Sequence, residues 1–132
     1  MRKACEATMD FQFHCSKRAA KCVKKSKHRL GECCADVMKV LSTNPEYGAL
    51  IRDTGGLRKM RVHVPSLHTG KSGGYRLIYK PMMVDEVWKI ALLAAYFKGD
   101  CEDLSQAEYD GIFGEAEEIF NDYAGKFEWE EA

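Results

Sequence analysis

The sequence predicts an α+β fold with a small, mainly antiparallel sheet, two helices in the N-terminal part and one helix in the C-terminal part. Segments that alternate between polar and apolar residues occur before and after segments with helical spacing, so the chain lacks the regular strand–helix alternation of parallel α/β folds. Two strand-like segments are separated only by a loop rich in Gly, Ser and Thr, Pro65–Gly74, as in a hairpin with a long connection. The 132 residues, 45% of them hydrophobic, predict a single domain spanning 1–132.

The N-terminal part predicts a strand and two helices. Met9–Cys15 alternates between apolar and polar residues, as a half-buried strand does. Ser16 can cap a lysine-rich helix that continues to Lys27. A second helix is expected over His28–Ser42, because apolar residues and cysteines recur there every three or four positions. Pro45 then ends the helix, since the residue before a proline disfavours helical geometry.

Three strands are expected in the middle of the chain. After a turn at Thr54–Gly56, the run Lys59–Val64 alternates, which places apolar side chains on one face and cations on the other. Tyr75–Lys80 is its expected hairpin partner, ended by Pro81 because proline cannot donate to a sheet ladder. Val87–Tyr96 is almost entirely apolar, which favours a central strand over a buried helix.

The C-terminal part predicts one acidic, amphipathic helix followed by an acidic tail. Ser105 and Glu108 have the spacing of a capping box at its start. Apolar residues from Tyr109 to Phe127 recur at helical spacing, and acidic residues occupy the opposite side. We therefore expect this helix to pack on the sheet.

The net charge of zero conceals a strong asymmetry along the chain. Residues 1–30 carry nine Lys or Arg against two acids, and residues 61–99 carry six against two. Residues 100–132 carry one basic residue against twelve acids. Such a distribution is typical of a basic working surface on a body whose acidic segment faces away or shields it, although solvated helix faces give the same count.

Several protein classes are not favoured by the sequence. No window approaches the roughly 18 apolar residues of a membrane-spanning helix, and the first residues lack the layout of a secretory signal, so we expect a cytoplasmic protein. The six cysteines are interpreted as reduced thiols. A zinc site at the four central cysteines is less favoured because no C-x-x-C pair occurs among Cys15, Cys22, Cys33 and Cys34. We predict no metal and no cofactor.

The main candidate site is a group of cations on or beside the predicted sheet. Folding could gather four of them on one concave wall, and this predicted wall consists of Lys59, Arg61, Arg76 and Lys98. Such a cluster is repulsive unless a polyanion such as RNA occupies it, whereas isolated strand cations often only extend into solvent. A phosphate-binding loop is excluded at Lys71, because Pro65 stands where its first glycine is required and no helix follows.

The order and spacing of several short motifs over roughly residues 40–112 resemble the RelE/HigB-like toxins of bacterial toxin–antitoxin modules. The motifs that carry this resemblance are Asn44-Pro45-Glu46-Tyr47-Gly48, Gly56-Leu57-Arg58-Lys59-Met60-Arg61, Gly70-Lys71-Ser72-Gly73-Gly74-Tyr75-Arg76-Leu77-Ile78-Tyr79, Ala95-Tyr96-Phe97-Lys98 and Glu102-Asp103-Leu104-Ser105. The resemblance implies a compact RelE-like fold and a toxin that inhibits translation. It further implies metal-independent cleavage of messenger RNA on the ribosome, and neutralisation by a cognate antitoxin, expected to be a small DNA-binding repressor.

The resemblance also implies site residues by position. In the expected reaction, a ribose 2′-hydroxyl attacks the neighbouring phosphate. Arg61 and Arg76 are expected to stabilise the phosphorane, Lys98 to bind phosphate or assist the leaving group, and Lys59 to act as base if its pKa is lowered. Further contacts with RNA are expected from five residues, namely Arg58, His63, Lys71, Lys21 and Lys24.

Two alternatives remain open at this point. One is a module that binds RNA or the ribosome without cutting, and the other is a gyrase-inhibiting toxin of the same superfamily. The sequence departs from the family pattern in that Gly99–Glu102, directly after the last strand, contains no aromatic residue for acid–base or stacking work. Tyr109 lies nearby, but its spacing places it in the apolar stripe of the last helix.

Overall fold

The computed structural model of the protein describes residues 10–27, 29–65 and 74–121. Its elements follow the order β1 (Asp10–Cys15), α1 (Lys17–Lys25), a 3₁₀ turn η2 (Leu30–Cys33), α2 (Cys34–Thr43), β2 (Ala49–Leu50), β3 (Arg58–Val62), β4 (Tyr75–Val84), β5 (Val87–Phe97) and α3 (Gln106–Asn121). The predicted α+β class is confirmed. Met9, His28, Lys71 and the acidic tail lie outside the described residues.

The strands form one sheet in the order β1-β5-β4-β3-β2. β1 pairs with β5 in parallel, whereas the other three pairings are antiparallel. The mainly antiparallel sheet was predicted correctly, and β5, predicted as a central strand, is an interior strand between β1 and the middle strand β4. β2 was not predicted, because a two-residue strand has no periodicity that a sequence can display.

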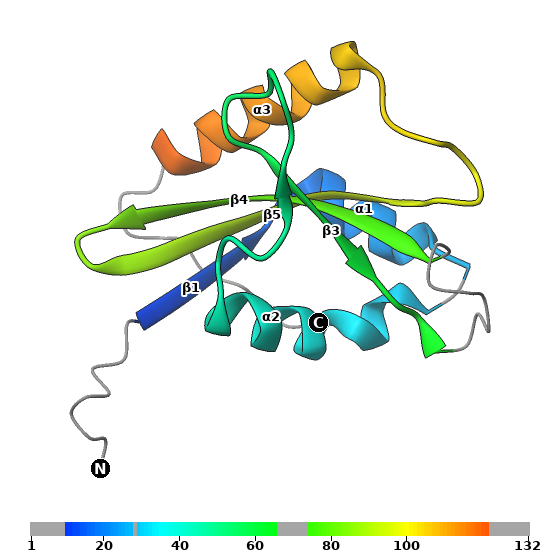
Figure 1. The fold of residues 1–132 in the computed structure, drawn as a ribbon, viewed down its shortest axis with the longest axis horizontal. Coiled ribbons are helices and arrows are strands. Elements are labelled where there is room, and N and C mark those ends of the chain that lie inside the picture. The colour runs from blue at the N-terminus through cyan, green and yellow to red at the C-terminus, as the bar shows by residue number, and fades with distance from the viewer. Residues whose placement is uncertain (1–9, 28, 66–73, 122–132) are drawn as a thin grey trace.

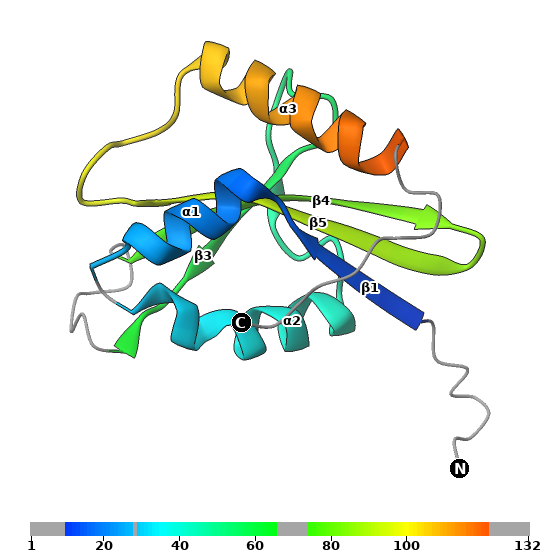
Figure 2. The ribbon, with the colours of Figure 1, turned by 180° about the vertical axis from the view of Figure 1, so that it is seen from behind.

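The helices lie on both sides of this sheet (Figure 1). α2 lies on one side and α3 on the other, and the view from behind shows α1 beside the end of β1 (Figure 2). Each side has its own apolar core. One core joins α2 to the sheet through residues that include Val37, Leu41 and Met60, and the other joins α3 to the sheet through residues that include Ile78, Ala94 and Ile112.

Ser16 makes the junction between β1 and α1. Its hydroxyl oxygen accepts a hydrogen bond from the backbone N–H of Ala19 at 3.0 Å, as an N-cap does, and the same hydroxyl donates to the carbonyl of Leu93 at 3.2 Å. Its backbone N–H donates to the carbonyl of Leu92 at 3.0 Å, where the pairing of β1 with β5 ends. α1 therefore packs beside the second half of β5, and the predicted cap is confirmed.

The second predicted helix begins differently from expectation. Its first turn is the 3₁₀ segment η2, preceded by Arg29 in the left-handed conformation with φ 58°, and the α-helix starts only at Cys34. The tighter 3₁₀ turn keeps Leu30 and Cys33 on the buried side, while Cys34 turns partly towards solvent. The expectation of a continuous α-helix from residue 28 was wrong, although the apolar stripe points to the core as predicted.

The prediction that β4 ends before Pro81 was also wrong. β4 continues to Val84, and Pro81 lies opposite Ile90 of β5. The pairing with β3 has already ended at Tyr79, opposite Arg58, so the last part of β4 pairs only with β5. A proline is tolerated there because an edge strand needs no donor on its open side.

The capping box predicted for α3 is confirmed. The backbone N–H of Glu108 donates to the Ser105 hydroxyl at 3.1 Å, and the backbone N–H of Ser105 donates to the Glu108 carboxylate at 2.9 Å.

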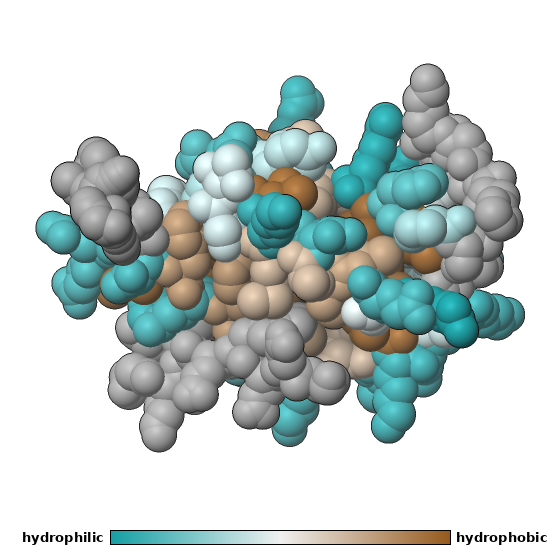
Figure 3. Space-filling model, turned by 90° about the horizontal axis from the view of Figure 1, so that it is seen from below, coloured by the Kyte–Doolittle hydropathy of each residue, from teal (hydrophilic) through white to brown (hydrophobic). Residues whose placement is uncertain are grey.

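No helix in the described part of the chain combines the length and apolar character that crossing a bilayer requires. On the side of the molecule that includes α2, polar residues gather towards both ends and a more apolar band runs between them (Figure 3).

Candidate functional site

A row of polar side chains crosses three strands on the α3 side of the sheet. Arg61 of β3 lies directly opposite Arg76 of β4, and Arg76 lies directly opposite Tyr96 of β5. Successive side chains of a strand point to opposite faces, so Arg76 shares the face of Ile78, which packs against α3. The row therefore continues the α3 side of the sheet beyond the apolar core.

Three of the four predicted wall cations line one hollow. Its volume is about 380 Å³, and its lining consists of Lys59, Arg61, Arg76, Met60, Ala49, Leu50 and Ile51. Arg76 is buried, with 7% of its surface exposed, whereas Arg61 is exposed. The hollow thus presents one guanidinium held within the fold and one that reaches solvent. A single phosphate group at its mouth could interact with both.

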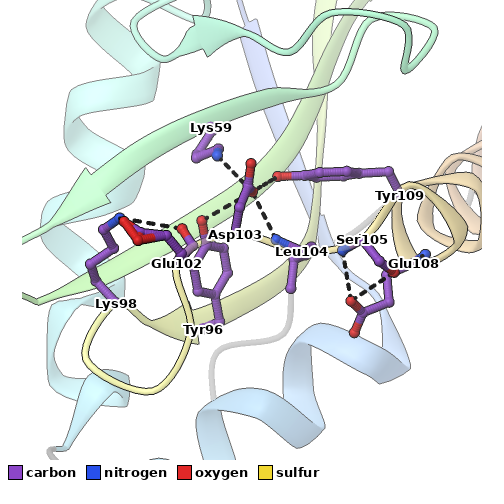
Figure 4. Close-up of polar contacts among 9 residues, drawn as sticks. All are labelled: Lys59, Tyr96, Lys98, Glu102, Asp103, Leu104, Ser105, Glu108 and Tyr109. Atoms are coloured by element: carbon purple, nitrogen blue, oxygen red, sulfur yellow. Dashed lines mark hydrogen bonds and ion pairs between the residues drawn. The ribbon is translucent and has the colours of Figure 1, made fainter.

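Lys98 is not part of the lining of this hollow. Its backbone N–H donates to the carbonyl of Gly74 at 2.9 Å, which extends the contact between β4 and β5. Its ammonium group donates to the Glu102 carboxylate at 3.1 Å and to the Glu102 carbonyl at 3.3 Å. Figure 4 shows Lys98 beside Glu102 and Lys59 beside the next residue of the same loop, Asp103.

Asp103 is the hub of the polar contacts beside the hollow (Figure 4). Its Oδ1 atom accepts hydrogen bonds from the Lys59 ammonium at 3.0 Å and from the Tyr109 hydroxyl at 2.5 Å. The same atom accepts from the backbone N–H of Leu104 at 2.8 Å and, at a longer 3.5 Å, from the Tyr96 hydroxyl. Burial by itself raises the pKa of Asp103, but the hydrogen bonds from Tyr109 and Lys59 outweigh it and lower the pKa to about 2.

The environment of Lys59 does not suit a base. Burial lowers the pKa of Lys59, but the hydrogen bond to Asp103 and the interactions with Tyr109 outweigh burial and raise the pKa above its ordinary value. Lys59 was expected to act as base only if its pKa is lowered, and Asp103, which lies far from Lys59 in the sequence, raises it instead. In this arrangement Lys59 remains a cation at neutral pH.

Two tyrosines flank the lysine. The Lys59 ammonium lies 6.0 Å from the ring centres of both Tyr96 and Tyr109. Burial and the hydrogen bond to Asp103 raise the pKa of Tyr109 to about 12, and burial also raises the pKa of Tyr96 despite the opposing charge of Lys59. Both phenols are therefore protonated at neutral pH, and can donate hydrogen bonds or protons.

Arg58 lies apart from the hollow. It alternates with Lys59 along β3, so its side chain leaves the opposite face of the strand. Its guanidinium donates to the carbonyls of Gly48 at 2.7 Å and Glu46 at 3.2 Å, and thus holds the turn before β2. Strand alternation already placed Arg58 on the face opposite Lys59, but its contacts with Gly48 and Glu46 had no sequence signal.

The remaining predicted contact residues are dispersed. Lys21 and Lys24 are exposed on α1, which packs on β5, whereas the hollow lies at β2, β3 and β4. His63 is exposed just beyond the end of β3. Lys21 and Lys24 are therefore separated from the hollow, whereas His63 lies only two residues after Arg61 but is not part of the lining.

The cysteines do not form a second polar site. The five in the described part of the chain, Cys15, Cys22, Cys33, Cys34 and Cys101, are free thiols. Burial, reinforced by the neighbouring thiols of Cys34 and Cys22, raises the pKa of Cys15 to about 11. No group of three or more His, Cys, Asp or Glu side chains in residues 10–27, 29–65 and 74–121 is arranged to hold a metal ion.

Sequence reasoning missed two members of the site. Asp103 was noted only as part of a motif before the last helix, and Tyr96 only as a neighbour of Lys98. The capping box at Ser105 could have drawn attention to Asp103, because acidic side chains are favoured just before a helix N-terminus. The alignment of Tyr96 with Arg76 depends on strand register and had no sequence signal.

No family model matches the chain. Among solved structures, the backbone is similar to that of an arginine double mutant of the Escherichia coli toxin RelE in the free state. The TM-score is 0.48 at 19% sequence identity, and the match covers 83% of this chain and 97% of that chain.

Proposed function

We propose that the protein is the toxin of a toxin–antitoxin module and acts as an endoribonuclease on messenger RNA. The observation that carries the proposal is the direct pairing of Arg61 with Arg76 at a hollow that Lys59 also lines. Arg61 and Arg76 carry like charges on neighbouring strands, and a bound phosphodiester would offset their repulsion, while Lys59 is paired with Asp103. The motifs shared with RelE/HigB-like toxins support the same function independently of the geometry.

The proposed reaction is a transesterification within the RNA chain. A bond forms between the ribose 2′-oxygen and the adjacent phosphorus, and the bond from phosphorus to the 5′-oxygen of the next nucleotide breaks. The 2′-hydroxyl loses its proton to a base, and the leaving 5′-oxygen gains a proton from an acid. The products are a 2′,3′-cyclic phosphate and a 5′-hydroxyl. The scheme needs no metal ion if the cations of the site stabilise the phosphorane.

The geometry supports a division of roles among the residues of the row. Arg61 and Arg76 are suited to the phosphorane, because guanidinium forks match phosphate oxygens. Tyr96 lies opposite Arg76 and is protonated at neutral pH, so we assign it proton donation to the leaving oxygen. Lys59 acts as a further cation. Lys98 releases the Glu102 carboxylate and binds a neighbouring phosphate in its place.

The proposed partners are messenger RNA, the ribosome and an antitoxin, all met in the cytoplasm. The exposed Lys21 and Lys24 of α1 would contact ribosomal RNA, and His63 would contact RNA outside the hollow. Lys71 is proposed as a further RNA contact. Arg58 would support binding indirectly, through the turn that it holds before β2.

The proposal is tested by inducing the protein in a bacterium and mapping the 5′ ends of transcripts. Wild type is expected to stop growth and to create new 5′ ends within coding regions, and Arg76→Ala is expected to do neither. Arg52→Ala is the matched control, because Arg52 is an exposed arginine outside the lining of the hollow. Intact transcripts in cells that contain the folded wild-type protein would contradict the proposal.

One observation favours a second candidate, an RNA-binding module that does not cut. Among the described residues that line the hollow, Lys59 was the expected base. Its pairing with Asp103 makes it unavailable for that role. This candidate predicts salt-sensitive RNA binding with intact transcripts. Intact transcripts together with DNA-damage signalling would instead indicate the gyrase-inhibiting branch of the superfamily.

The proposed antitoxin has its own test. A small DNA-binding repressor encoded next to this protein should restore growth when the two are expressed together. A neighbouring repressor that binds neither the protein nor its promoter would contradict this part of the proposal.

A further inference from the structure

We propose that Asp103 is a positioning residue for Lys59, and that it holds the Lys59 ammonium beside the hollow as a fixed cation instead of a proton acceptor. This inference rests on the proposed function and deepens it. It assigns a role to an acidic residue in the site of an enzyme whose substrate is itself an anion. It also replaces the base expected at Lys59 with an electrostatic group.

The geometry that supports the inference is the convergence of donors on one oxygen atom. Oδ1 of Asp103 accepts from Lys59 of β3, from Tyr109 of α3 and, at a longer distance, from Tyr96 of β5. These donors belong to three different elements, so the carboxylate is fixed relative to both the sheet and the helix (Figure 4). Because several hydrogen bonds fix the orientation of the Asp103 carboxylate, the carboxylate in turn fixes the position of the Lys59 ammonium that it binds.

Tyr109 makes this arrangement rigid. Its side chain is 4% exposed and packs in the apolar core with Ile112 and Leu93, so the hydroxyl cannot move away without disturbing α3. Ser105 and Glu108 cap the same helix one turn earlier. Asp103 lies just before this cap, where the helix dipole favours a negative charge. The carboxylate is therefore tied to the capped N-terminal end of α3.

The charges around Lys59 explain why it needs a fixed partner. The titratable groups that face it are Asp103, Tyr96 and Tyr109, and Arg61 and Arg76 line the same hollow. Burial and the two arginines both disfavour a charged ammonium, and Asp103 is the one anion among these groups. If Asp103 loses its negative charge, the pKa of Lys59 should fall, and the ammonium should no longer be held in one orientation.

An opposing interpretation is that Asp103 merely occupies the place of an RNA phosphate and blocks the hollow. Removal of its charge would then tighten RNA binding and leave the chemical step intact. The positioning role predicts the reverse, because a misdirected Lys59 stabilises the transition state less than before while Arg61 and Arg76 still bind phosphate. The effects on kcat and KM therefore separate the two interpretations.

The test compares Asp103→Asn with Asp100→Asn in the full-length protein. Asp100 belongs to the same loop and is exposed, so the control makes the same chemical change away from Lys59. Two properties are measured: RNA cleavage over a range of pH, and the titration of the Lys59 side chain by NMR, with Lys59→Arg used to assign the signal. Melting curves establish that each variant is folded.

For Asp103→Asn we expect kcat to fall about 10- to 100-fold, with KM changed less than about threefold. The Lys59 titration should move to lower pH, and kcat should decline at alkaline pH where wild type does not. Asp100→Asn should leave all of these unchanged. An unchanged Lys59 titration, or a lower KM with kcat retained, would overturn the inference.

A second variant guards against a folding defect. Tyr109→Phe removes one hydroxyl that orients Asp103, and it should shift the Lys59 titration in the same direction by a smaller amount. An unchanged titration in folded Tyr109→Phe would contradict the positioning role, whereas Asp103→Glu keeps the charge and should keep the Lys59 titration near that of wild type. If wild type cleaves no RNA, the proposed function fails, but the titration still decides whether Asp103 controls Lys59.

Discussion

The α3 side of the sheet has an apolar half, which α3 covers, and a cationic half, which lies beyond it. Under α3, Ile78 and Ala94 face each other across β4 and β5 and pack against Ile112. One step further along the same face of β4, Arg76 replaces the apolar residue and lies between Arg61 and Tyr96. The two halves share strands and register, so the cover that α3 provides is what separates core from site.

Tyr109 connects the two halves. Its ring belongs to the core beneath α3, and its hydroxyl reaches Asp103 in the polar half. We therefore expect changes in the apolar half to alter mainly the free energy of unfolding, and changes in the cationic half to alter mainly RNA cleavage. Changes at the N-terminus of α3 should alter both.

The largest effect is expected in the apolar half. Ile112 is 1% exposed, so Ile112→Ala should lower the free energy of unfolding by about 2–5 kcal/mol through lost contacts and an internal cavity. Urea unfolding measures this change. The cleavage rate per folded molecule should stay near that of wild type, and a rate that falls in step with stability would break the division.

Arg76→Lys tests the cationic half. Lysine keeps the charge but loses the planar fork that matches phosphate oxygens, so we expect kcat/KM for RNA to fall about 100-fold, or roughly 2.7 kcal/mol in transition-state stabilisation. Thermal melting should change little in comparison with Ile112→Ala. Cleavage within threefold of wild type would show that the row does not carry the chemistry.

The helix N-terminus should affect both properties modestly. Ser105→Ala removes the cap that accepts from the backbone N–H of Glu108, which should cost about 1 kcal/mol of stability. Because Asp103 directly precedes this cap, kcat should also fall a few-fold. Ser42→Ala, in the last turn of α2, is the control that should leave kcat unchanged. Equal effects of the two variants on kcat would show that the helix start does not order the site.

The smallest effect is a dependence of stability on acid pH. The pKa of Asp103 falls from 3.8 to about 2 on folding, so the unfolded chain takes up the proton first as the pH decreases. The stabilisation from this group is complete above about pH 4 and is lost as the pH falls towards 2. Urea unfolding between about pH 4 and pH 2 should show that the free energy of unfolding decreases less in Asp103→Asn than in wild type. An identical loss would mean that other carboxylates account for it.

The elements with strong local signals were predicted well from the sequence. The alternation around Met60, the cap at Ser16 and the capping box at Ser105 each express a short-range rule, and each is present in the structure. β4 was predicted too short because the effect of Pro81 depends on whether a neighbouring strand is present. That information belongs to the assembled sheet.

The site could be predicted only in part for the same reason. Alternation indicated that Lys59 and Arg61 share a face, but the position of Arg76 opposite Arg61 depends on the register of the hairpin. The pairing of Lys59 with Asp103 joins residues 44 positions apart, and it raises the pKa of Lys59, whereas the base role requires a lowered pKa. Charge balance at a site is a property of the folded chain, so neighbouring residues in the sequence do not reveal it.

The most direct test of the account is the identity of the RNA ends made by the purified protein in a translating extract. We predict 2′,3′-cyclic phosphate and 5′-hydroxyl ends within messages, formed in the presence of a metal chelator added after ribosome stalling. Arg76→Lys should reduce their number about 100-fold, and Arg52→Ala should not. Ends that carry a 5′-phosphate, or an equal yield from Arg76→Lys, would contradict the proposal that the paired arginines stabilise attack by a 2′-hydroxyl.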